Sequence, residues 1–216
     1  METYQYSSEF KAAQQKTCDL GYQLDNLKKY TISTGFQELL DEETSIIVNT
    51  LYRTFDKYKE LGFSPVNKFR TDCFGIHMLI YEYLQTEHIN STITLGSIEY
   101  DGKSYFEAPL LNYIQGTTQI PMDEKVNMPV ISAHAWITIE DRIIIDATIG
   151  SYLINPQNDN QCLGKLIYGD IGKLYTREIQ SKYEYCNENK EIDLLLLTYH
   201  PVVTGINVFK YLFSID

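Results

Sequence analysis

The segment 132–148 restricts the fold of this chain more than any other. Two runs of β-branched and aromatic residues flank Glu140-Asp141, a pattern that predicts a β-hairpin. Each strand carries one polar residue, His134 in the first and Asp146 in the second. Asp146 follows three isoleucines, so its carboxylate is expected to be buried, and a buried carboxylate requires a partner. His134 is the nearest candidate.

The register of this hairpin decides whether the two polar side chains meet. A three-residue loop at 139–141 would place His134 directly opposite Asp146, with both side chains on one face. Asp146 would then bond Nδ1 of His134 and leave Nε2 free. A two-residue loop at Glu140-Asp141 would place His134 opposite Ala147 and turn Asp146 to the other face. The sequence is compatible with both registers, and a His–Asp pair requires the first, or a bulge with the same effect.

Cys73 lies where a third helix, predicted over 72–87, begins. Thr71 or Asp72 is expected to cap this helix. Free backbone amides and the helix dipole at such a position stabilise a thiolate and can also hold an oxyanion. Cys, His and Asp are the parts of an activated thiol nucleophile, which makes Cys73, His134 and Asp146 a candidate catalytic triad. The alternative is a structural core cysteine beside a core histidine.

A second pairing of the same cysteine is with His77. These residues are four apart, so they share a helix face and have the spacing of a metal-binding pair. No second Cys/His pair completes such a site, and His77 is therefore expected on the helix face or in the core. The chemistry predicted for Cys73 requires neither a metal nor an organic cofactor.

The order of the predicted elements, helices first and then strands, indicates a single α+β domain over 1–216. It divides into a helical part at 1–62, a core motif at 63–150 and a mixed part at 151–216. The elements expected outside the central motif are helices at 7–30, 36–61, 170–186 and 208–213, strands at 92–100, 103–108 and 194–199, and a long loop at 109–129.

Charge and hydropathy limit the kinds of partner and the cellular compartment that we expect for this protein. The formal net charge is −11 without a Lys/Arg cluster, so no nucleic-acid partner is expected. No apolar run approaches the length of a membrane span, so no membrane partner is expected either. The N-terminal residues lack the pattern of a signal peptide. We therefore expect a cytoplasmic protein with free thiols, or one exported by a signal-peptide-independent route.

These motifs resemble those of a known group. Asp72-Cys73-Phe74-Gly75, His134-Ala135-Trp136-Ile137 and Asp146-Ala147-Thr148 are similar to the transglutaminase-like branch of the papain-like cysteine enzymes. That branch has Cys, then His-Ala-Trp-Val, then Asp-Pro-Thr. The separations of 61 residues from Cys73 to His134 and 12 from His134 to Asp146 fit the group. The resemblance covers about 75 residues in the middle of the chain.

The resemblance implies a fold, a reaction and further site residues. The fold is papain-like, with N-terminal helices and a nucleophile-bearing helix packed on an antiparallel sheet. The reaction is acyl transfer from a protein or peptide amide. Water as acceptor makes a peptidase, amidase or glutamine deamidase, and an amine makes a transglutaminase. Asn67 occupies the offset of the papain-type oxyanion glutamine, Trp136 is a candidate substrate contact, and the loop 109–129 is a candidate gate.

Other interpretations remain open at this point. The arylamine N-acetyltransferases share the triad, but their Arg-Gly-Gly-x-Cys-Phe motif stands here as Arg70-Thr71-Asp72-Cys73-Phe74, without the glycines. A catalytically silent papain-like binding protein is a second alternative. Deployment as a bacterial effector that modifies a protein of another cell is compatible with either class. The sequence specifies neither the substrate nor the oligomeric state.

Overall fold

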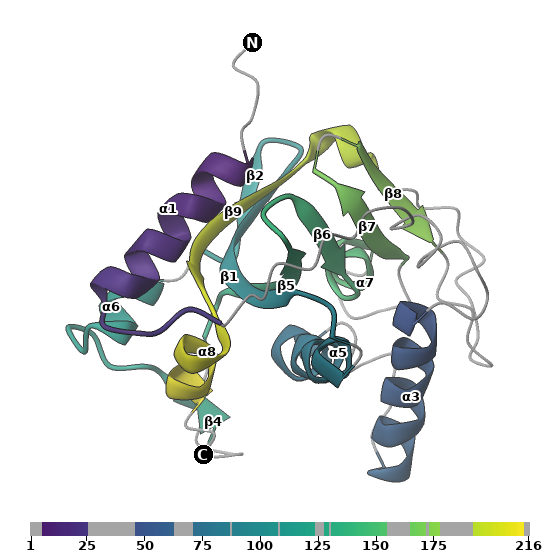
Figure 1. The fold of residues 1–216 in the computed structure, drawn as a ribbon, viewed down its shortest axis with the longest axis horizontal. Coiled ribbons are helices and arrows are strands. Elements are labelled where there is room, and N and C mark those ends of the chain that lie inside the picture. The colour runs from purple at the N-terminus through teal and green to yellow at the C-terminus, as the bar shows by residue number, and fades with distance from the viewer. Residues whose placement is uncertain are drawn as a thin grey trace.

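The computed structural model describes residues 6–25, 46–62, 71–86, 88–107, 109–123, 128–129, 131–154, 165–171, 173–177 and 192–213. Its centre is a curled, antiparallel seven-stranded sheet surrounded by helices (Figure 1). The predicted α+β class is confirmed. None of the helices within these ranges is long and apolar enough to cross a membrane.

β1 is the longest strand and organises the sheet. It pairs with β2, β5 and β9, and the order β2-β1-β5-β6-β7-β8 continues from it. Asp101 and Gly102, both with positive φ, form the turn of the predicted β1–β2 hairpin. The strands of the main sheet are β1 (Ser91–Tyr100), β2 (Lys103–Tyr105), β5 (His134–Ile139), β6 (Ile143–Asp146), β7 (Leu166–Asp170), β8 (Lys173–Arg177) and β9 (Leu197–Thr204). A separate pair consists of β3 (Met122–Asp123) and β4 (Met128–Pro129).

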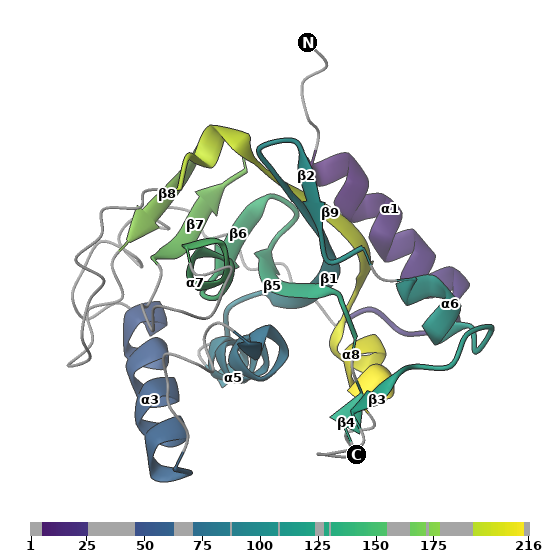
Figure 2. The same cartoon turned by 180° about the vertical axis from the view of Figure 1, so that it is seen from behind.

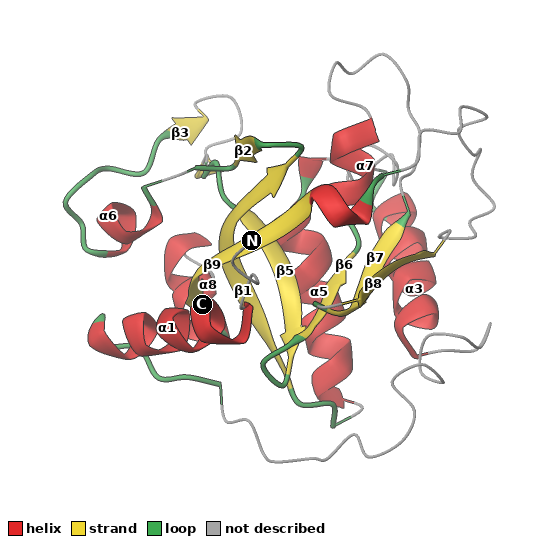
Figure 3. Ribbon diagram, turned by 90° about the horizontal axis from the view of Figure 1, so that it is seen from above, coloured by secondary structure: helices red, strands yellow, loops and turns green. Residues whose placement is uncertain are grey.

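The helices cover the sheet from several sides. α1 lies along β9, whereas α5 packs beneath β5 and has α3 beside it (Figure 1). α7 lies against the β6–β7 part of the sheet (Figure 2), and α1 and α3 are at opposite ends of the molecule (Figure 3). The helices are α1 (Tyr6–Asp19), α3 (Ile46–Glu60), α5 (Cys73–Thr86), α6 (Leu110–Ile114), α7 (Ile149–Ile154) and α8 (Ile206–Phe213), with a 3₁₀ turn at Leu194–Leu196.

The central hairpin is buried on both faces, and the two faces differ in chemistry. Alternation along the strands sends one set of side chains toward α5 and the other toward α1 and α7. We call the first set the aliphatic face; it comprises Ala135, Ile137 and Ile139 of β5 with Ile143 and Ile145 of β6. We call the second set the aromatic face; it comprises His134, Trp136 and Thr138 of β5 with Ile144 and Asp146 of β6.

Gly96 allows three strands to meet next to the site. This residue of β1 is paired with His134 of β5 on one side and with Pro201 of β9 on the other. A Cβ atom at Gly96 would collide with the backbone carbonyl oxygen of His200 and lie 2.9 Å from the Trp136 ring. Only glycine permits this approach, so the position of Trp136 beneath the sheet depends on it.

Of the first two predicted helices, one ends earlier than expected and the other ends where expected. The helix predicted over 7–30 ends at Asp19, because the chain turns at Gly21, which has a φ of 87°. The helix predicted over 36–61 is observed from Ile46 to Glu60 and stops before Gly62, which has a φ of 79°. Residues 36–45 lie outside the described ranges.

Three predictions in the second half of the chain are corrected. The loop predicted at 109–129 contains α6, whose apolar residues pack against α8. The helix predicted at 170–186 is wrong where it can be compared, since 173–177 is β8 of a hairpin with β7. The strand predicted at 194–199 begins only at Leu197 and continues through Pro201 to Thr204. The closing helix at 208–213 is confirmed as the greater part of α8.

Candidate active site

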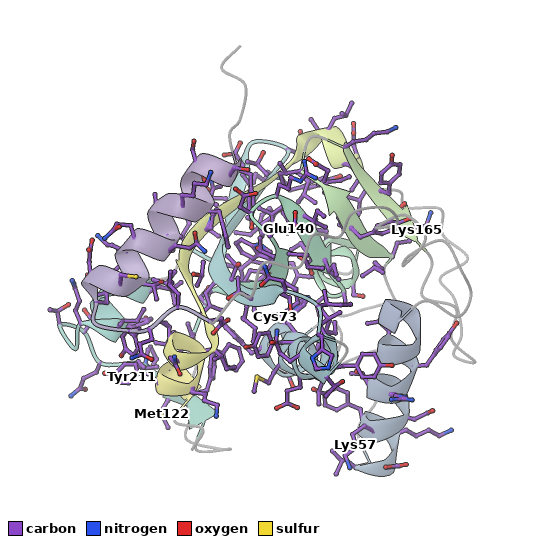
Figure 4. The ribbon with its side chains drawn as sticks, in the orientation of Figure 1. Lys57, Cys73, Met122, Glu140, Lys165 and Tyr211 are labelled. Carbon is purple, nitrogen blue, oxygen red and sulfur yellow. The ribbon has the colours of Figure 1, made fainter. Side chains whose placement is uncertain are left out.

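The nucleophile candidate is the first residue of α5. Asp72 caps this helix, because its Oδ1 accepts a hydrogen bond of 2.9 Å from the backbone N–H of Gly75. The N–H groups of a first helical turn have no partner within the helix, which applies here to those of Cys73 and Phe74. Figure 4 shows Cys73 where α5 meets the strands. The half-buried thiol is thus held at the positive end of a helix dipole.

α3 fixes this end of α5. Tyr58 Oη donates a hydrogen bond of 3.3 Å to Oδ2 of Asp72, the second oxygen of the capping carboxylate. The fit is close, since a Cβ atom on Gly75 would lie 2.7 Å from Tyr58 Oη and 2.8 Å from Asp72 Oδ2. Gly75 therefore lets Tyr58 and Asp72 meet above the first turn, and Cys73 is positioned by two helices.

The hairpin has neither of the two expected registers. Its loop is Glu140-Asp141-Arg142, and Ile139 pairs with Ile143. His134 is therefore not directly opposite Asp146 but displaced by two residues along the strand. A shift of two preserves the alternation of side chains, so His134 and Asp146 still project from the same face as diagonal neighbours. Neither of the two registers that the sequence left open is observed, whereas the expected contact between these side chains is.

His134 and Asp146 form a short, buried hydrogen-bonded pair. Nε2 of His134 lies 2.7 Å from Oδ2 of Asp146, and both side chains are almost completely buried. Tyr199 Oη also donates to Oδ2, at 3.1 Å. Oδ1 accepts from the backbone N–H groups of Thr148 and Ile149, at 2.9 and 3.0 Å. The carboxylate is thus satisfied on both oxygens and cannot rotate without breaking several hydrogen bonds.

The nitrogen that contacts Asp146 is the opposite of the one expected. Nε2 of His134, and not Nδ1, bonds the carboxylate, because the ring enters from the diagonal position. Nδ1 is buried and has no nitrogen or oxygen partner among the described residues. This nitrogen is therefore the one that remains for proton transfer.

The charges of this pair stabilise each other. Burial alone would lower the pKa of His134, but the charge of Asp146, its hydrogen bond and the nearby Cys73 outweigh burial and raise that pKa to about 10. Burial alone would raise the pKa of Asp146, but the His134 cation holds it well below its usual range. Near neutral pH the pair is an imidazolium and a carboxylate.

Cys73 and His134 open onto the same cavity. The cavity has a volume of about 250 Å³, and the walls around these two residues include Phe74, Phe106 and Tyr152. Phe106 stacks on the His134 ring with 5.1 Å between centroids. Asp146 does not line the cavity and lies behind the imidazole. A group bound in the cavity would therefore meet the thiol and the imidazole, with the carboxylate shielded.

His77 is a buried core histidine, which is one of the two positions that we expected for it. Both of its ring nitrogens form hydrogen bonds. Nδ1 donates to the carbonyl oxygen of Cys73 at 2.7 Å, and Nε2 accepts from the N–H of Ala147 at 3.1 Å. Burial lowers the pKa of His77 to about 4, despite Asp146 at 3.6 Å, so this ring is neutral and the contact is not an ion pair. Neither nitrogen has a lone pair left for a metal, and the described residues contain no group of three candidate metal ligands.

The other predicted site residues have different positions. Trp136 is completely buried; its indole N–H donates to Tyr6 Oη at 2.8 Å, and its ring packs beside His134. A fully buried ring offers no surface to a substrate. Trp136 therefore packs beside the imidazole of His134 and supports it, and does not contact a substrate. Asn67 lies outside the described residues. Within the proposed gate, residues 109–122 contribute no side chain to the cavity wall.

Several residues at the site were missed by sequence reasoning. Tyr199 is 53 residues beyond Asp146, and no local pattern connects them. Phe106 and Tyr152, whose rings are 4.7 Å apart, were hidden among many aromatic residues. The hydrogen bond from His77 to the carbonyl oxygen of Cys73 could have been predicted from their spacing, because a side chain in a helix can bond the backbone carbonyl four residues earlier.

Comparison with known proteins gives no relative. The sequence matches no protein-family model, no curated protein is significantly similar to it, and no solved structure matches its fold.

Proposed function

We propose that this protein is a cysteine acyl-transfer enzyme with Cys73 as nucleophile, His134 as acid and base, and Asp146 as the residue that orients His134. The observation that carries the proposal is the buried contact of 2.7 Å between Nε2 of His134 and Asp146. This contact leaves Nδ1 of the same ring without a nitrogen or oxygen partner among the described residues, and the ring lines the same cavity as Cys73. A buried imidazolium beside a thiol at a helix start favours the thiolate form of that thiol.

The first half of the reaction forms a thioester. Sγ of Cys73 attacks the carbonyl carbon of an amide, an S–C bond forms, and the carbonyl electron pair moves onto oxygen. We assign the stabilisation of that oxyanion to backbone N–H groups at the start of α5. The oxyanion then re-forms the carbonyl while the C–N bond breaks, and Nδ1 of His134 gives its proton to the leaving amine. The products are a thioester on Cys73 and a free amine.

The second half of the reaction releases the acyl group. His134, now neutral, accepts a proton at Nδ1 from water or from an acceptor amine as that molecule attacks the thioester carbon. The C–S bond breaks and Cys73 returns as thiolate opposite the imidazolium. Water yields a carboxylic acid, as in a peptidase, amidase or glutamine deamidase, and an amine yields a new amide, as in a transglutaminase. Every proton is carried by His134, so no metal or cofactor is required.

The family proposal rests on the order and placement of these groups. A Cys-bearing helix packed on an antiparallel sheet, with His and Asp on two adjacent strands, is the arrangement that the motifs led us to expect. We therefore propose a transglutaminase-like member of the papain-like cysteine enzymes acting on protein or peptide amides. The glycine motif of the arylamine N-acetyltransferases has no counterpart here, which favours amide chemistry.

The test is the pH dependence of alkylation by iodoacetamide at each cysteine, with site readout by mass spectrometry. Cys18, on the exposed surface of α1, is an internal reference within the same molecule. We expect Cys73 to react faster than Cys18 across the range from pH 6 to pH 8, with the largest difference at pH 6.

The matched variant is His134→Ala. It should remove the reactivity of Cys73 at pH 6 and leave that of Cys18 unchanged. Turnover of peptide amides should be lost in Cys73→Ser. If Cys73 in the wild type reacts no faster than Cys18, or is indifferent to His134, the enzyme proposal is wrong and the protein is better regarded as a binding module.

A further inference from the structure

The cavity beside Cys73 has mostly apolar walls. Five apolar or aromatic side chains and the two hydroxyl residues Thr71 and Thr148 line it around the thiol and the imidazole; the five are Phe74, Phe106, Ile131, Ala133 and Tyr152. Apart from the reacting residues Cys73 and His134, none of the described residues that line the cavity carries a charged side chain. Walls of this kind desolvate an apolar group favourably and penalise the burial of a charge.

The size of the cavity limits what can enter it. A volume of about 250 Å³ is small for an organic ligand site, for which about 300–1,000 Å³ is typical. It is nevertheless larger than a cavity of about 150 Å³ that accommodates benzene in another protein. One aryl ring or one branched aliphatic side chain therefore fits inside it.

The backbone holds one wall in a strained conformation. Phe106 has a φ of 65°, a left-handed conformation that a bulky residue rarely adopts. Its ring stacks on His134 on one side and contacts Tyr152 on the other. Strain of this kind costs about 1–3 kcal/mol and persists where the surroundings enforce it, often at functional sites. Here it places an apolar ring where the cavity meets the imidazole.

We propose that this cavity is the acyl-side pocket of the enzyme and that it selects amides whose acyl part carries one uncharged aryl or branched aliphatic group. The inference rests on the proposed function, since it assigns a substrate class to the same site. Phe106 and Tyr152 are the specificity-determining walls. A substrate with a carboxylate or an ammonium group at that position would have to bury a charge against these rings and is rejected.

Three haloacetamide probes test the selectivity directly. In each, Sγ of Cys73 forms a bond to the CH₂ carbon, the C–I bond breaks and iodide leaves. The probes are iodoacetamide, N-benzyl-iodoacetamide and N-(4-carboxybenzyl)-iodoacetamide. The last two share the benzyl ring and the leaving group and differ by one carboxylate. We expect Cys73 to prefer the benzyl probe over iodoacetamide by about 10-fold, the effect of burying one ring. The carboxylated probe should lose that gain.

Cys18 again serves as the reference, because the three probes should differ little at an exposed thiol. The readout is the ratio of rates between probes, which cancels the intrinsic reactivity of the thiol. If Cys73 is fast and depends on His134 but does not distinguish the probes, the pocket inference is wrong and the enzyme proposal stands. If Cys73 is as slow as Cys18 with every probe, the enzyme proposal itself fails.

A pair of variants locates the selectivity. Tyr152→Ala removes part of the cavity wall and should reduce the benzyl preference several-fold. Tyr105→Ala is the control, since Tyr105 packs on Tyr152 with centroids 6.2 Å apart but does not line the cavity. Phe106 is unsuitable for this purpose, because its ring also stacks on His134. Equal loss of preference in both variants would contradict a role of the wall.

Discussion

The two faces of the central hairpin are held in place by different kinds of interaction. The aliphatic face consists of isoleucine and alanine, makes no side-chain hydrogen bonds and packs on α5. On the aromatic face, Tyr6 Oη accepts from the Trp136 indole at 2.8 Å and bonds Thr138 at 2.7 Å, and Tyr199 bonds Asp146 at 3.1 Å. Packing by volume tolerates small shifts, whereas hydrogen bonds specify direction.

The candidate triad is divided between these faces. Cys73 arrives with α5, the helix that packs on the aliphatic face, while His134 and Asp146 belong to the aromatic face. They meet at the end of the hairpin, where β5 begins and β6 ends. The difference suggests that volume sets the distance of the thiol and that directed bonds set the orientation of the imidazole. Substitutions at Asp146, Tyr199, Ile137 and Tyr6 separate these contributions.

The largest effect is expected for Asp146→Asn. This change removes the charge that holds the His134 cation and leaves a buried imidazole without its counter-ion. We expect the free energy of unfolding to fall by about 3–5 kcal/mol. The rate of Cys73 alkylation at pH 6 should fall at least ~100-fold, because the imidazole loses both charge partner and orientation. Urea denaturation and site-resolved alkylation measure the two effects.

Tyr199→Phe is the matched control for Asp146→Asn, since it removes one hydrogen bond from the same carboxylate and leaves the charge. It should lower the unfolding free energy by about 1–2 kcal/mol, with a much smaller effect on alkylation. An Asp146→Asn protein that alkylates as fast as the wild type would mean that orientation by this face is unimportant.

A change on the aliphatic face should affect stability alone. Ile137 is completely buried, and Ile137→Ala leaves a cavity between β5 and α5. We expect a loss of about 2–5 kcal/mol in urea denaturation. The ratio of Cys73 to Cys18 alkylation in the folded protein should stay within a factor of two or three of the wild type (about 0.5 kcal/mol). A collapse of that ratio would show that the aliphatic face also orients the site.

His77 should make the protein sensitive to mild acid. Its folded-state pKa of about 4 lies below the ~6.5 of an unfolded chain, so below pH 6.5 the unfolded state binds the extra proton. Stability should therefore decline by up to about 3 kcal/mol between pH 6.5 and 4. His134 adds no slope there, because its raised pKa leaves it protonated in both states; its contribution is lost instead as the pH rises from 6.5 toward 10.

Urea denaturation at a series of pH values checks this, with His77→Gln as the variant. Glutamine retains polar groups but does not titrate, so the slope between pH 6.5 and 4.5 should flatten whatever its effect on absolute stability. A slope that persists unchanged in the variant would assign the acid sensitivity to other groups.

The smallest effect is expected for Tyr6→Phe. This change removes one hydroxyl that bonds Thr138 and Trp136 on the aromatic face, at the other end from Asp146. We expect a loss of about 1–2 kcal/mol, because two buried polar groups lose a partner. Alkylation of Cys73 should not change. A decrease in alkylation would show that the whole aromatic face, and not only its end, positions the imidazole.

Sequence reasoning succeeded where the signal was local. The start of α5 at Cys73 and its cap at Asp72 follow from adjacent residues. The central hairpin has neither of the registers left open by the sequence, yet His134 and Asp146 meet, because a shift of two residues from the first of them preserves the face. The segment of β8 was mistaken for part of a helix over 170–186, because its pairing with β7, and that of β7 with β6, has no signal in the local sequence.

The parts that escaped prediction depend on distant segments. Tyr199 reaches Asp146 only because β9 pairs with β1, and Tyr6 reaches Trp136 only because α1 packs on β9. The periodicity of neither segment indicates such a contact. The strained Phe106 was equally hidden, because a positive φ at a phenylalanine contradicts local preference and is imposed by its surroundings.

The contact between α1 and β9 has a consequence for how the chain is made. The first described helix docks on the last strand, and Thr204 N–H donates to Thr17 Oγ1 at 2.9 Å. During synthesis α1 must therefore wait until β9 has left the ribosome before its apolar side is covered. Because the same strand brings Tyr199 to Asp146, the docking of α1 and the environment of His134 are completed in the same step. A nascent chain would thus carry Cys73 without its finished surroundings until β9 has emerged.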